Sequence, residues 1–234
     1  MFALDQVVPW GRSFDEYQRM FALTPFGLAQ PILGCGDGPA SFNAEATARG
    51  IRVTSCDPIY QFDEAQLRQR IDETSAEVLE QTRRNAHEFV WSTIGTIEDL
   101  RETRMTAMRL FLDDFVAGKA SGRYRADALP VLPFADDTFG LALSSHFLVL
   151  YTTQLGDTFH LEALREMCRV AREVRVFPLL ALGSRPSPLV PVVTADLQSR
   201  GFDVQILPVP YEFQRGGNQM MRISRRAPSS SVMR

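Results

Sequence analysis

The chain has 234 residues, of which 45% are hydrophobic and 23% are charged, and its formal net charge is −3. This composition is typical of an ordinary globular protein and lacks the basic excess of nucleic-acid-binding proteins. No apolar run approaches the roughly 20 residues of a membrane span, and the N-terminus lacks the pattern of a signal peptide. We therefore expect a cytoplasmic protein that binds neither nucleic acid nor membranes, with Cys35, Cys56 and Cys168 as free thiols.

One helix is predicted within the first 30 residues. Ser13 suits its N-cap and Glu16 stands three residues further on, which is the capping-box pattern. Apolar and aromatic residues then repeat on one helical face. The helix either docks on the rest of the protein through this face or closes Trp10, Arg12 or Tyr17 over a bound ligand, with Tyr17 the best candidate.

Residues 31–57 predict a strand, a tight glycine turn, a helix and a second strand that ends at a carboxylate. The turn is Gly34-Cys35-Gly36-Asp37-Gly38, whose glycines let backbone N–H groups approach a ligand closely. Pro39 suits the first position of the helix, where a missing N–H is no loss. Gly50 suits the left-handed residue that closes the helix.

The carboxylate at the end of the second strand is Asp57, roughly 20 residues after the first glycine of the turn. In doubly wound sheets an acid at this place accepts hydrogen bonds from ribose hydroxyls. The alternative is an aspartate that only caps a loop. A dinucleotide fingerprint, G-x-G-x-x-G, is not completed, because here the third glycine comes one position early and is followed by Pro39.

Two helical sections are predicted after Asp57, over residues 63–90 and 97–116. Together they exceed the ~30 residues of a plain crossover between parallel strands. This insertion, residues 63–120, either packs as an elaboration on the sheet edge or forms a cap over the substrate site.

The segment 123–151 predicts a short strand, a turn-rich approach and a buried strand at 141–143. Ser144, Ser145 and His146 follow at the carboxyl end of the buried strand, where ligands bind in open α/β sheets. His146 is either a general base, because its ordinary pKa lies near neutrality, or a packed histidine bonded to the backbone.

The remaining chain predicts alternating helices and strands: a helix at 158–172, a strand at 174–177, a helix at 192–199, and a last pair of strands at 202–209 and 219–224. The terminal strand pair is expected to be antiparallel. Residues 227–234 are expected to form a flexible tail.

Three of these features together resemble the class I, Rossmann-like S-adenosylmethionine-dependent methyltransferases. They are the G-x-G-x-G turn, the segment Leu-Pro-Phe-Ala-Asp-Asp-Thr-Phe-Gly at 132–140, and the terminal strand pair. The resemblance covers about residues 9–224, and strings such as PWGRSFDEY and YEFQRGGNQM resemble a bacterial subgroup of unassigned substrate. The resemblance implies an α/β fold with a doubly wound Rossmann-like seven-stranded methyltransferase sheet and an antiparallel C-terminal strand. The sheet belongs to a single domain over residues 1–226. The helical insertion lies between strands two and three of this domain.

The resemblance also implies S-adenosylmethionine as cofactor, with its methionyl end at the glycine turn and its ribose at Asp57. One extra residue precedes the Leu-Pro-Phe segment, so the adenine contact falls either to Asp127 or to Ala128 and Leu129. The aspartate usual after the phenylalanine of that segment is Gly140 here. The expected cofactor-binding residues are Tyr17, Gly34, Cys35, Gly36, Asp37, Asp57, Pro58, Asp127, Ala128, Leu129, Ser144 and Ser145.

The expected function is methyl transfer to a small-molecule acceptor, with His146 as the candidate catalytic residue and no metal site. Ser144-Ser145-His146-Phe147 replaces the Asp/Asn-Pro-Pro-Tyr/Phe motif of DNA amine methylation, and no cysteine stands in the Pro-Cys pair of cytosine methylation. One alternative is a cofactor-binding protein without turnover, which Gly140 and the weak signal for a base suggest. The other is a nicotinamide-dependent oxidoreductase, which shares the glycine turn and Asp57 but would need a Tyr-x-x-x-Lys pair.

Overall fold

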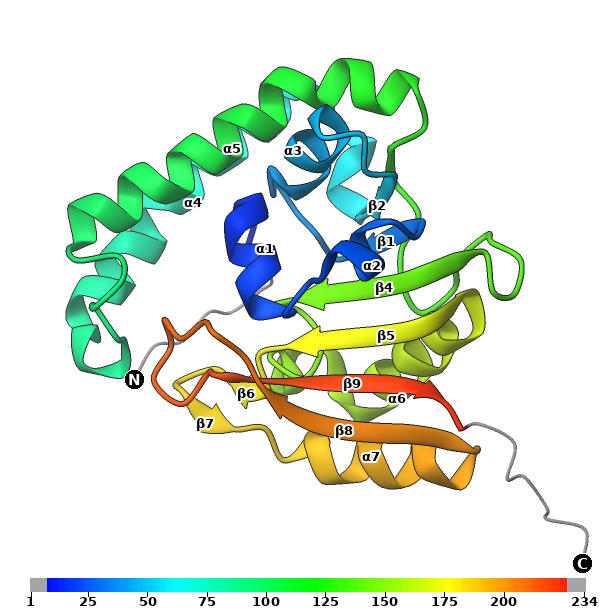
Figure 1. The fold of residues 1–234 in the computed structure, drawn as a ribbon. Coiled ribbons are helices and arrows are strands. Elements are labelled where there is room, and N and C mark those ends of the chain that lie inside the picture. The colour runs from blue at the N-terminus through cyan, green and yellow to red at the C-terminus, as the bar shows by residue number, and fades with distance from the viewer. Residues whose placement is uncertain (1–7, 227–234) are drawn as a thin grey trace, which may run out of the picture.

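The structure, a computed structural model, describes residues 8–226, so the tail expected at 227–234 lies outside the described residues. A seven-stranded sheet runs through its centre in the order β3-β2-β1-β4-β5-β9-β8 (Figure 1). The strands from β3 to β5 pair in parallel, and β9 is antiparallel to both of its neighbours. The predicted doubly wound α/β fold, with seven strands and one antiparallel strand from the C-terminal part, is therefore confirmed.

The strands are β1 Ile32–Cys35, β2 Val53–Cys56, β3 Tyr124–Arg125, β4 Phe139–Ser145, β5 Ala171–Phe177, β8 Phe202–Pro208 and β9 Gln219–Arg225, and a separate hairpin joins β6 Leu180–Ala181 to β7 Arg185–Pro186. The helices are α1 Phe14–Met20, α2 Pro25–Leu28, α3 Phe42–Ala48, α4 Glu64–Arg84, α5 Ile97–Ala120, α6 Thr152–Val170 and α7 Leu189–Ser199, with short 3-10 helices η1 Pro58–Gln61 and η2 Ala86–Glu88.

Both faces of the sheet are covered by helices, which explains why the central strands are apolar throughout. Side chains alternate between the faces along a strand. Ile32 of β1 belongs to the apolar cluster that includes Phe14 of α1 and Phe42 of α3. Its neighbour Leu33 belongs to a second cluster, with residues of α6 and α7 such as Leu164. Two cores therefore hold the sheet between its helical layers.

Helix α3 begins later than the sequence predicts. Pro39 lies in a turn, and the helix starts at Phe42. The Ser41 N–H donates to the Arg12 carbonyl at 3.0 Å, and the Gly38 carbonyl accepts from the Tyr60 hydroxyl at 2.7 Å. These long-range bonds hold the backbone around Pro39 outside the helix.

Helix α6 starts six positions before the predicted boundary, at Thr152, with a break at Gly156. Gly156 has φ +74°, a conformation that glycine adopts without strain. The predicted closure of α3 by Gly50 is confirmed, since its φ is also +74°.

The insertion at 63–120 consists mainly of α4 and α5, which are linked through η2 and extend beyond the sheet (Figure 1). Met108, Phe111 and Phe115 of α5 pack with Tyr60 and Tyr124 in a third apolar cluster at the β3 edge. The opposite half of the insertion reaches over the carboxyl ends of the strands, toward α1.

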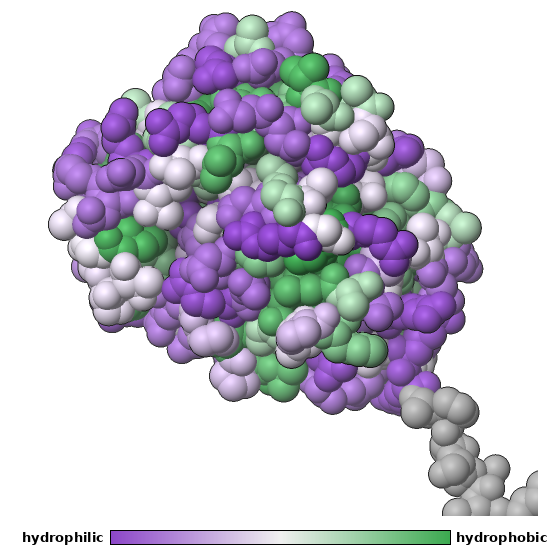
Figure 2. All heavy atoms as spheres, turned by 45° about the horizontal axis from the view of Figure 1, so that its top comes forward, coloured by the Kyte–Doolittle hydropathy of each residue, from purple (hydrophilic) through white to green (hydrophobic). Residues whose placement is uncertain are grey.

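The face drawn in Figure 2 is largely hydrophilic, and its hydrophobic side chains show in separate patches. Among residues 8–226, no helix combines the length and the apolar character that crossing a membrane requires.

Candidate functional site

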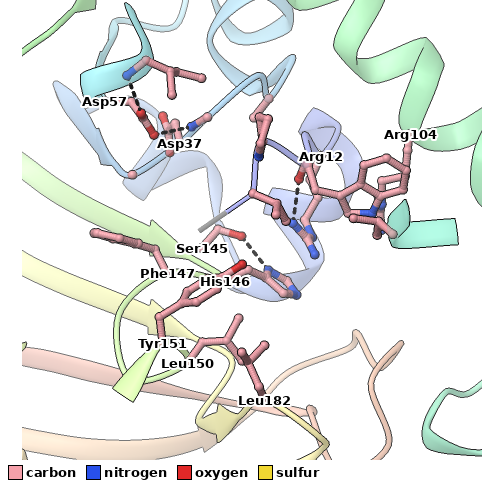
Figure 3. A pocket seen from close by; sticks show the side chains of 18 of the residues that line it. Arg12, Asp37, Asp57, Arg104, Ser145, His146, Phe147, Leu150, Tyr151 and Leu182 are labelled. Carbon is pink, nitrogen blue, oxygen red and sulfur yellow. Dashed lines mark hydrogen bonds between the residues drawn. The ribbon is translucent and has the colours of Figure 1, made fainter. Parts of the chain in front are cut away.

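A cavity of about 450 Å³ lies at the carboxyl ends of β1, β2 and β4. Its walls come from the glycine turn, the start of η1, the segment after β4, the N-terminal segment 8–12 and the insertion. Val78 of α4 and Leu100 of α5 contribute to the wall that the insertion forms. Figure 3 shows two acidic side chains together at one end and two arginines together at the other.

The glycine turn folds the Asp37 carboxylate back over strand β1. A Cβ atom at Gly34 would lie 1.7 Å from Asp37 Oδ2, so this fold requires glycine. Asp37 Oδ1 accepts from the Tyr17 hydroxyl at 2.9 Å and Oδ2 from the Ser55 hydroxyl at 2.6 Å. The ring of Tyr17 also stacks on Phe42 at 4.3 Å, so Tyr17 both docks α1 on α3 and fixes the turn.

Burial raises the pKa of Asp37 to about 6, although the hydrogen bonds from Ser55 and Tyr17 oppose the shift. The protonated acid is thus favoured by folding. The stability that the protonated Asp37 side chain contributes is fully present below about pH 4 and is lost as the pH rises through about 6. From the size of the pKa change we expect a loss of about 3 kcal/mol.

Urea denaturation between pH 4.5 and 7 measures this effect, with Asp37→Asn as the comparison protein. The free energy of unfolding of the wild-type protein should fall across this range relative to that of Asp37→Asn, which has no proton to lose at this position. Parallel profiles of the two proteins would contradict the shifted pKa.

Asp57 lies immediately after β2 and is buried, with 9% of its surface exposed. Its Oδ2 accepts from the Gly38 N–H and its Oδ1 from the Ile59 N–H, both at 2.9 Å. Burial raises the pKa of Asp57, while these two bonds act in the opposite direction. Each carboxylate oxygen has a second lone pair available, so Asp57 can cap η1 and still accept two hydrogen bonds from a ligand in the cavity.

The end of β4 presents a serine and a histidine to the cavity. Ser145 Oγ lies 2.9 Å from His146 Nδ1, and the His146 N–H donates to the Phe177 carbonyl at 2.6 Å. The backbone of His146 is left-handed, with φ +52°. Burial lowers the pKa of His146 well below its usual value, and the charges of Arg12 and Arg104 add to this effect. The imidazole is therefore neutral at physiological pH.

Arg104 of α5 is fully buried and forms an ion pair with Glu16 of α1, with 2.5 Å between Nη1 and Oε2. The hydroxyl of Tyr211 donates to Glu16 Oε1 at 2.8 Å. Burial alone would raise the pKa of Glu16, but Arg104 overrides it, with help from Arg12 and Ser13, and the pKa falls to about 2. This network joins α1, the insertion and the loop after β8.

Nine of the residues predicted for the site line the cavity, and four do not. Cys35 packs in the second apolar cluster, and Ser144 is fully buried, whereas its neighbour Ser145 lines the cavity. Asp127 forms an ion pair with Arg125 at 2.5 Å, which leaves Ala128 and Leu129 at the cavity. The nine are Tyr17, Gly36, Asp37, Asp57, Pro58, Ala128, Leu129, Ser145 and His146, and the four are Gly34, Cys35, Asp127 and Ser144.

Several cavity residues have no signal in the sequence that marks them as part of a site. Arg104 sits in a helix with many other charged residues, and Leu182 and Phe213 come from loops near the C-terminus. Arg12 stands in the segment expected to close over a ligand, and its guanidinium does line the cavity. Within the described residues, no group of three or more His, Cys, Asp or Glu side chains is arranged to hold a metal ion.

The sheet order, the antiparallel strand β9 and a cavity between the glycine turn and Asp57 define a protein with the class I methyltransferase fold. No family model matches the chain. The uncharacterized protein MJ0045 of Methanocaldococcus jannaschii is 31% identical over 224 residues, which cover 95% of this chain and 98% of that protein. The chain belongs to the family of this protein. Because MJ0045 is archaeal, the expected restriction to bacteria is not confirmed.

Solved methyltransferases show more distant similarity. The mitomycin 7-O-methyltransferase MmcR has a TM-score of 0.47 and 16% identity over 91% of this chain, which spans only 54% of the length of MmcR. An Aquifex aeolicus S-adenosylmethionine-dependent methyltransferase has a TM-score of 0.41 and 13% identity, covering 89% of this chain and 90% of its own. The Burkholderia thailandensis 1,6-didemethyltoxoflavin-N1-methyltransferase has a TM-score of 0.43 and 13% identity, with 86% of this chain and 73% of its own covered. At this level of similarity they carry no information on a substrate.

Proposed function

We propose that this protein is an S-adenosylmethionine-dependent methyltransferase that acts on a small-molecule acceptor. The observation that carries the proposal is the position of Asp57. Its carboxylate is tied to the glycine turn through the Gly38 N–H, it faces the cavity, and it retains lone pairs for two ribose hydroxyls.

The surroundings of Asp57 fit the rest of the cofactor. A Cβ at Gly38 would meet nothing within 4 Å, so the turn leaves open space next to Asp57. Pro58, Ala128 and Leu129 supply apolar surface for a flat base on one side. On the other side the buried carboxylate of Asp37 offers a negative charge to a cationic methionyl group.

S-adenosylmethionine, when bound, supplies a methyl group on a sulfonium, which is already a good leaving group. The protein therefore has to align the acceptor and exclude water. The cavity and its aromatic walls serve this purpose. His146 is neutral, and in the tautomer whose Nδ1–H donates to Ser145 Oγ, Nε2 is the nitrogen that would take a proton from an acceptor hydroxyl or amine.

Two other functions make different demands on the same cavity. A protein that binds the cofactor without turnover would need only the Asp57 end and no space for an acceptor. A nicotinamide-dependent oxidoreductase would need room for a pyrophosphate at the turn, where Phe147 instead lies so close that a Cβ at Gly36 would be 2.5 Å from its ring.

Isothermal titration with S-adenosylhomocysteine and with NADH distinguishes these functions at the level of binding. We expect saturable one-to-one binding of S-adenosylhomocysteine and no binding of NADH. The reverse preference, or no binding of S-adenosylhomocysteine by the folded protein, would overturn the proposal. Transfer of labelled methyl groups to a component of a cell extract then separates an enzyme from a protein without turnover.

A further inference from the structure

The cavity contains a guanidinium that forms no ion pair with a carboxylate of residues 8–226. Arg12 lines the cavity, and the only hydrogen bond that its guanidinium makes to residues within 8–226 runs from Nη1 to the Trp10 carbonyl at 2.9 Å. Its Nε atom is buried and has no partner. Arg12 as a whole is half-buried, but buried polar atoms in proteins are normally paired, so an Nε that no residue within 8–226 satisfies is open to a ligand in the cavity.

Among residues 8–226, the carboxylate whose charge acts on Arg12 is that of Glu16, but it makes no hydrogen bond to Arg12. Glu16 uses Oε2 for Arg104 and the Ser13 N–H, and Oε1 for Tyr211. Among the described residues, Arg12 and Arg104 both line the cavity, and of these two only Arg104 is hydrogen-bonded to the Glu16 carboxylate. The imidazole of His146, on which the charges of Arg12 and Arg104 act, is neutral. It therefore adds neither a negative nor a further positive charge.

Arg12 lies at the end of the cavity away from the proposed cofactor position. In Figure 3 Arg12 and Arg104 lie together on one side, and Asp37 and Asp57 lie together on the other. The charge of Arg12 acts on His146, Tyr151 and Tyr17, but it is not among the charges that shift the pKa of Asp37 or Asp57.

The cavity lining is rich in apolar and aromatic side chains. They include Trp10, Leu150, Tyr151, Leu182 and Phe213. A ligand that fits here would place an anionic group against the N–H donors of the Arg12 guanidinium and an apolar body against these side chains. Planar guanidinium matches a carboxylate with two parallel hydrogen bonds.

We propose that Arg12 is the carboxylate-binding residue for the methyl acceptor, so that the acceptor is an organic acid with an aromatic or aliphatic body. This inference rests on the proposed function, because it assigns the cofactor to the Asp57 end. Arg12 stays cationic and cannot accept a proton, so its role is binding and orientation and not proton transfer.

The same arginine could instead bind the carboxylate of the cofactor, and binding measurements separate the two sources. S-adenosylhomocysteine carries a carboxylate, whereas 5′-methylthioadenosine has the same adenosyl group without it. If Arg12 serves the acceptor, Arg12→Gln should bind both nucleosides as the wild-type protein does. Weaker binding of S-adenosylhomocysteine alone would overturn the assignment to the acceptor.

The acceptor site is tested on protein saturated with S-adenosylhomocysteine, with phenylacetate, indole-3-acetate and octanoate as probes and their primary amides as neutral counterparts. We expect at least one acid to bind about tenfold or more tightly than its amide, and Arg12→Gln to remove this difference. Arg12→Lys should retain part of this difference in affinity, because lysine keeps the positive charge but lacks the parallel N–H donors of the guanidinium. Arg101→Gln, the same change at an exposed position of α5, should have no effect.

The outcomes are distinct for the two proposals. Acids that bind no better than amides, or no acid binding at millimolar concentration, would overturn the inference while leaving the proposed function intact. Failure of S-adenosylhomocysteine to bind would overturn both. If Arg12→Gln does not fold, the acid–amide comparison on the wild-type protein and on Arg12→Lys still decides.

Discussion

Replacing Glu16 by glutamine is expected to lower the free energy of unfolding by about 3–5 kcal/mol, because it leaves a buried guanidinium without its counter-charge. Arg104 is 0% exposed, and its Nε has no partner. Arg12 lines the same cavity, so removing the negative charge leaves the two guanidiniums to repel each other. Urea denaturation at pH 7 measures the effect.

Asp15→Asn is the matched control for Glu16→Gln. Asp15 lies on the same helix and pairs with Arg19 at 2.7 Å, but its side chain is 73% exposed. Exposed pairs of this kind contribute at most about 1 kcal/mol. Equal losses in the two variants would mean that the ion pair of Glu16 does not matter for stability.

The pH profile gives a second readout of Glu16. Its pKa is depressed to about 2, so the stability that the ionised group contributes is complete above about pH 4.5 and is lost as the pH falls toward 2. Glu16→Gln should lack this acid-dependent loss. The double variant Glu16→Leu with Arg104→Met should be more stable than Glu16→Gln, because it removes both buried charges.

Replacing Asp57 by alanine is expected to weaken the binding of S-adenosylhomocysteine by roughly tenfold to a few hundredfold, since hydrogen bonds to a charged group contribute about 1.5–3 kcal/mol. The same change removes the cap of η1, which should cost about 1 kcal/mol of stability. Titration calorimetry and thermal melting on one preparation measure both effects.

Asp63→Ala separates the two roles of Asp57. Asp63 caps α4 through the Gln66 N–H at 2.8 Å but does not line the cavity. We expect Asp63→Ala to lose a similar amount of stability and to bind S-adenosylhomocysteine like the wild-type protein. If Asp57→Ala behaves in the same way, Asp57 is only a capping residue.

Local patterns in the sequence, with the resemblance to class I methyltransferases that they carry, were sufficient to predict the fold. The glycine turn, the apolar strand at 141–143 and the capping box of Ser13 and Glu16 depend on neighbouring residues, and each lies where it was expected. The start of α3 was not predictable in this way. Its position depends on bonds from the Ser41 N–H to Arg12 and from Tyr60 to Gly38, which cross 29 and 22 positions of the chain.

The end of the cavity formed by Arg12 and Arg104 could not be predicted from local patterns, because it also depends on contacts between residues far apart in the chain. Glu16 and Arg104 are 88 positions apart, and Glu16 and Tyr211 are 195 apart. Nothing near Arg104 distinguishes it from the solvated arginines of α5. The Asp57 end was predictable because the strand order of the fold brings the ends of β1 and β2 together.

A crystal structure of the protein with S-adenosylhomocysteine tests the central claim most directly. We expect both ribose hydroxyls within hydrogen-bond distance of Asp57, the adenine against Ala128 and Leu129, and the sulfur on the side of Ser145 and His146. Asp57 should keep its bonds from Gly38 and Ile59. A ribose bound away from Asp57, or a cavity that stays empty at saturating ligand, would contradict the account.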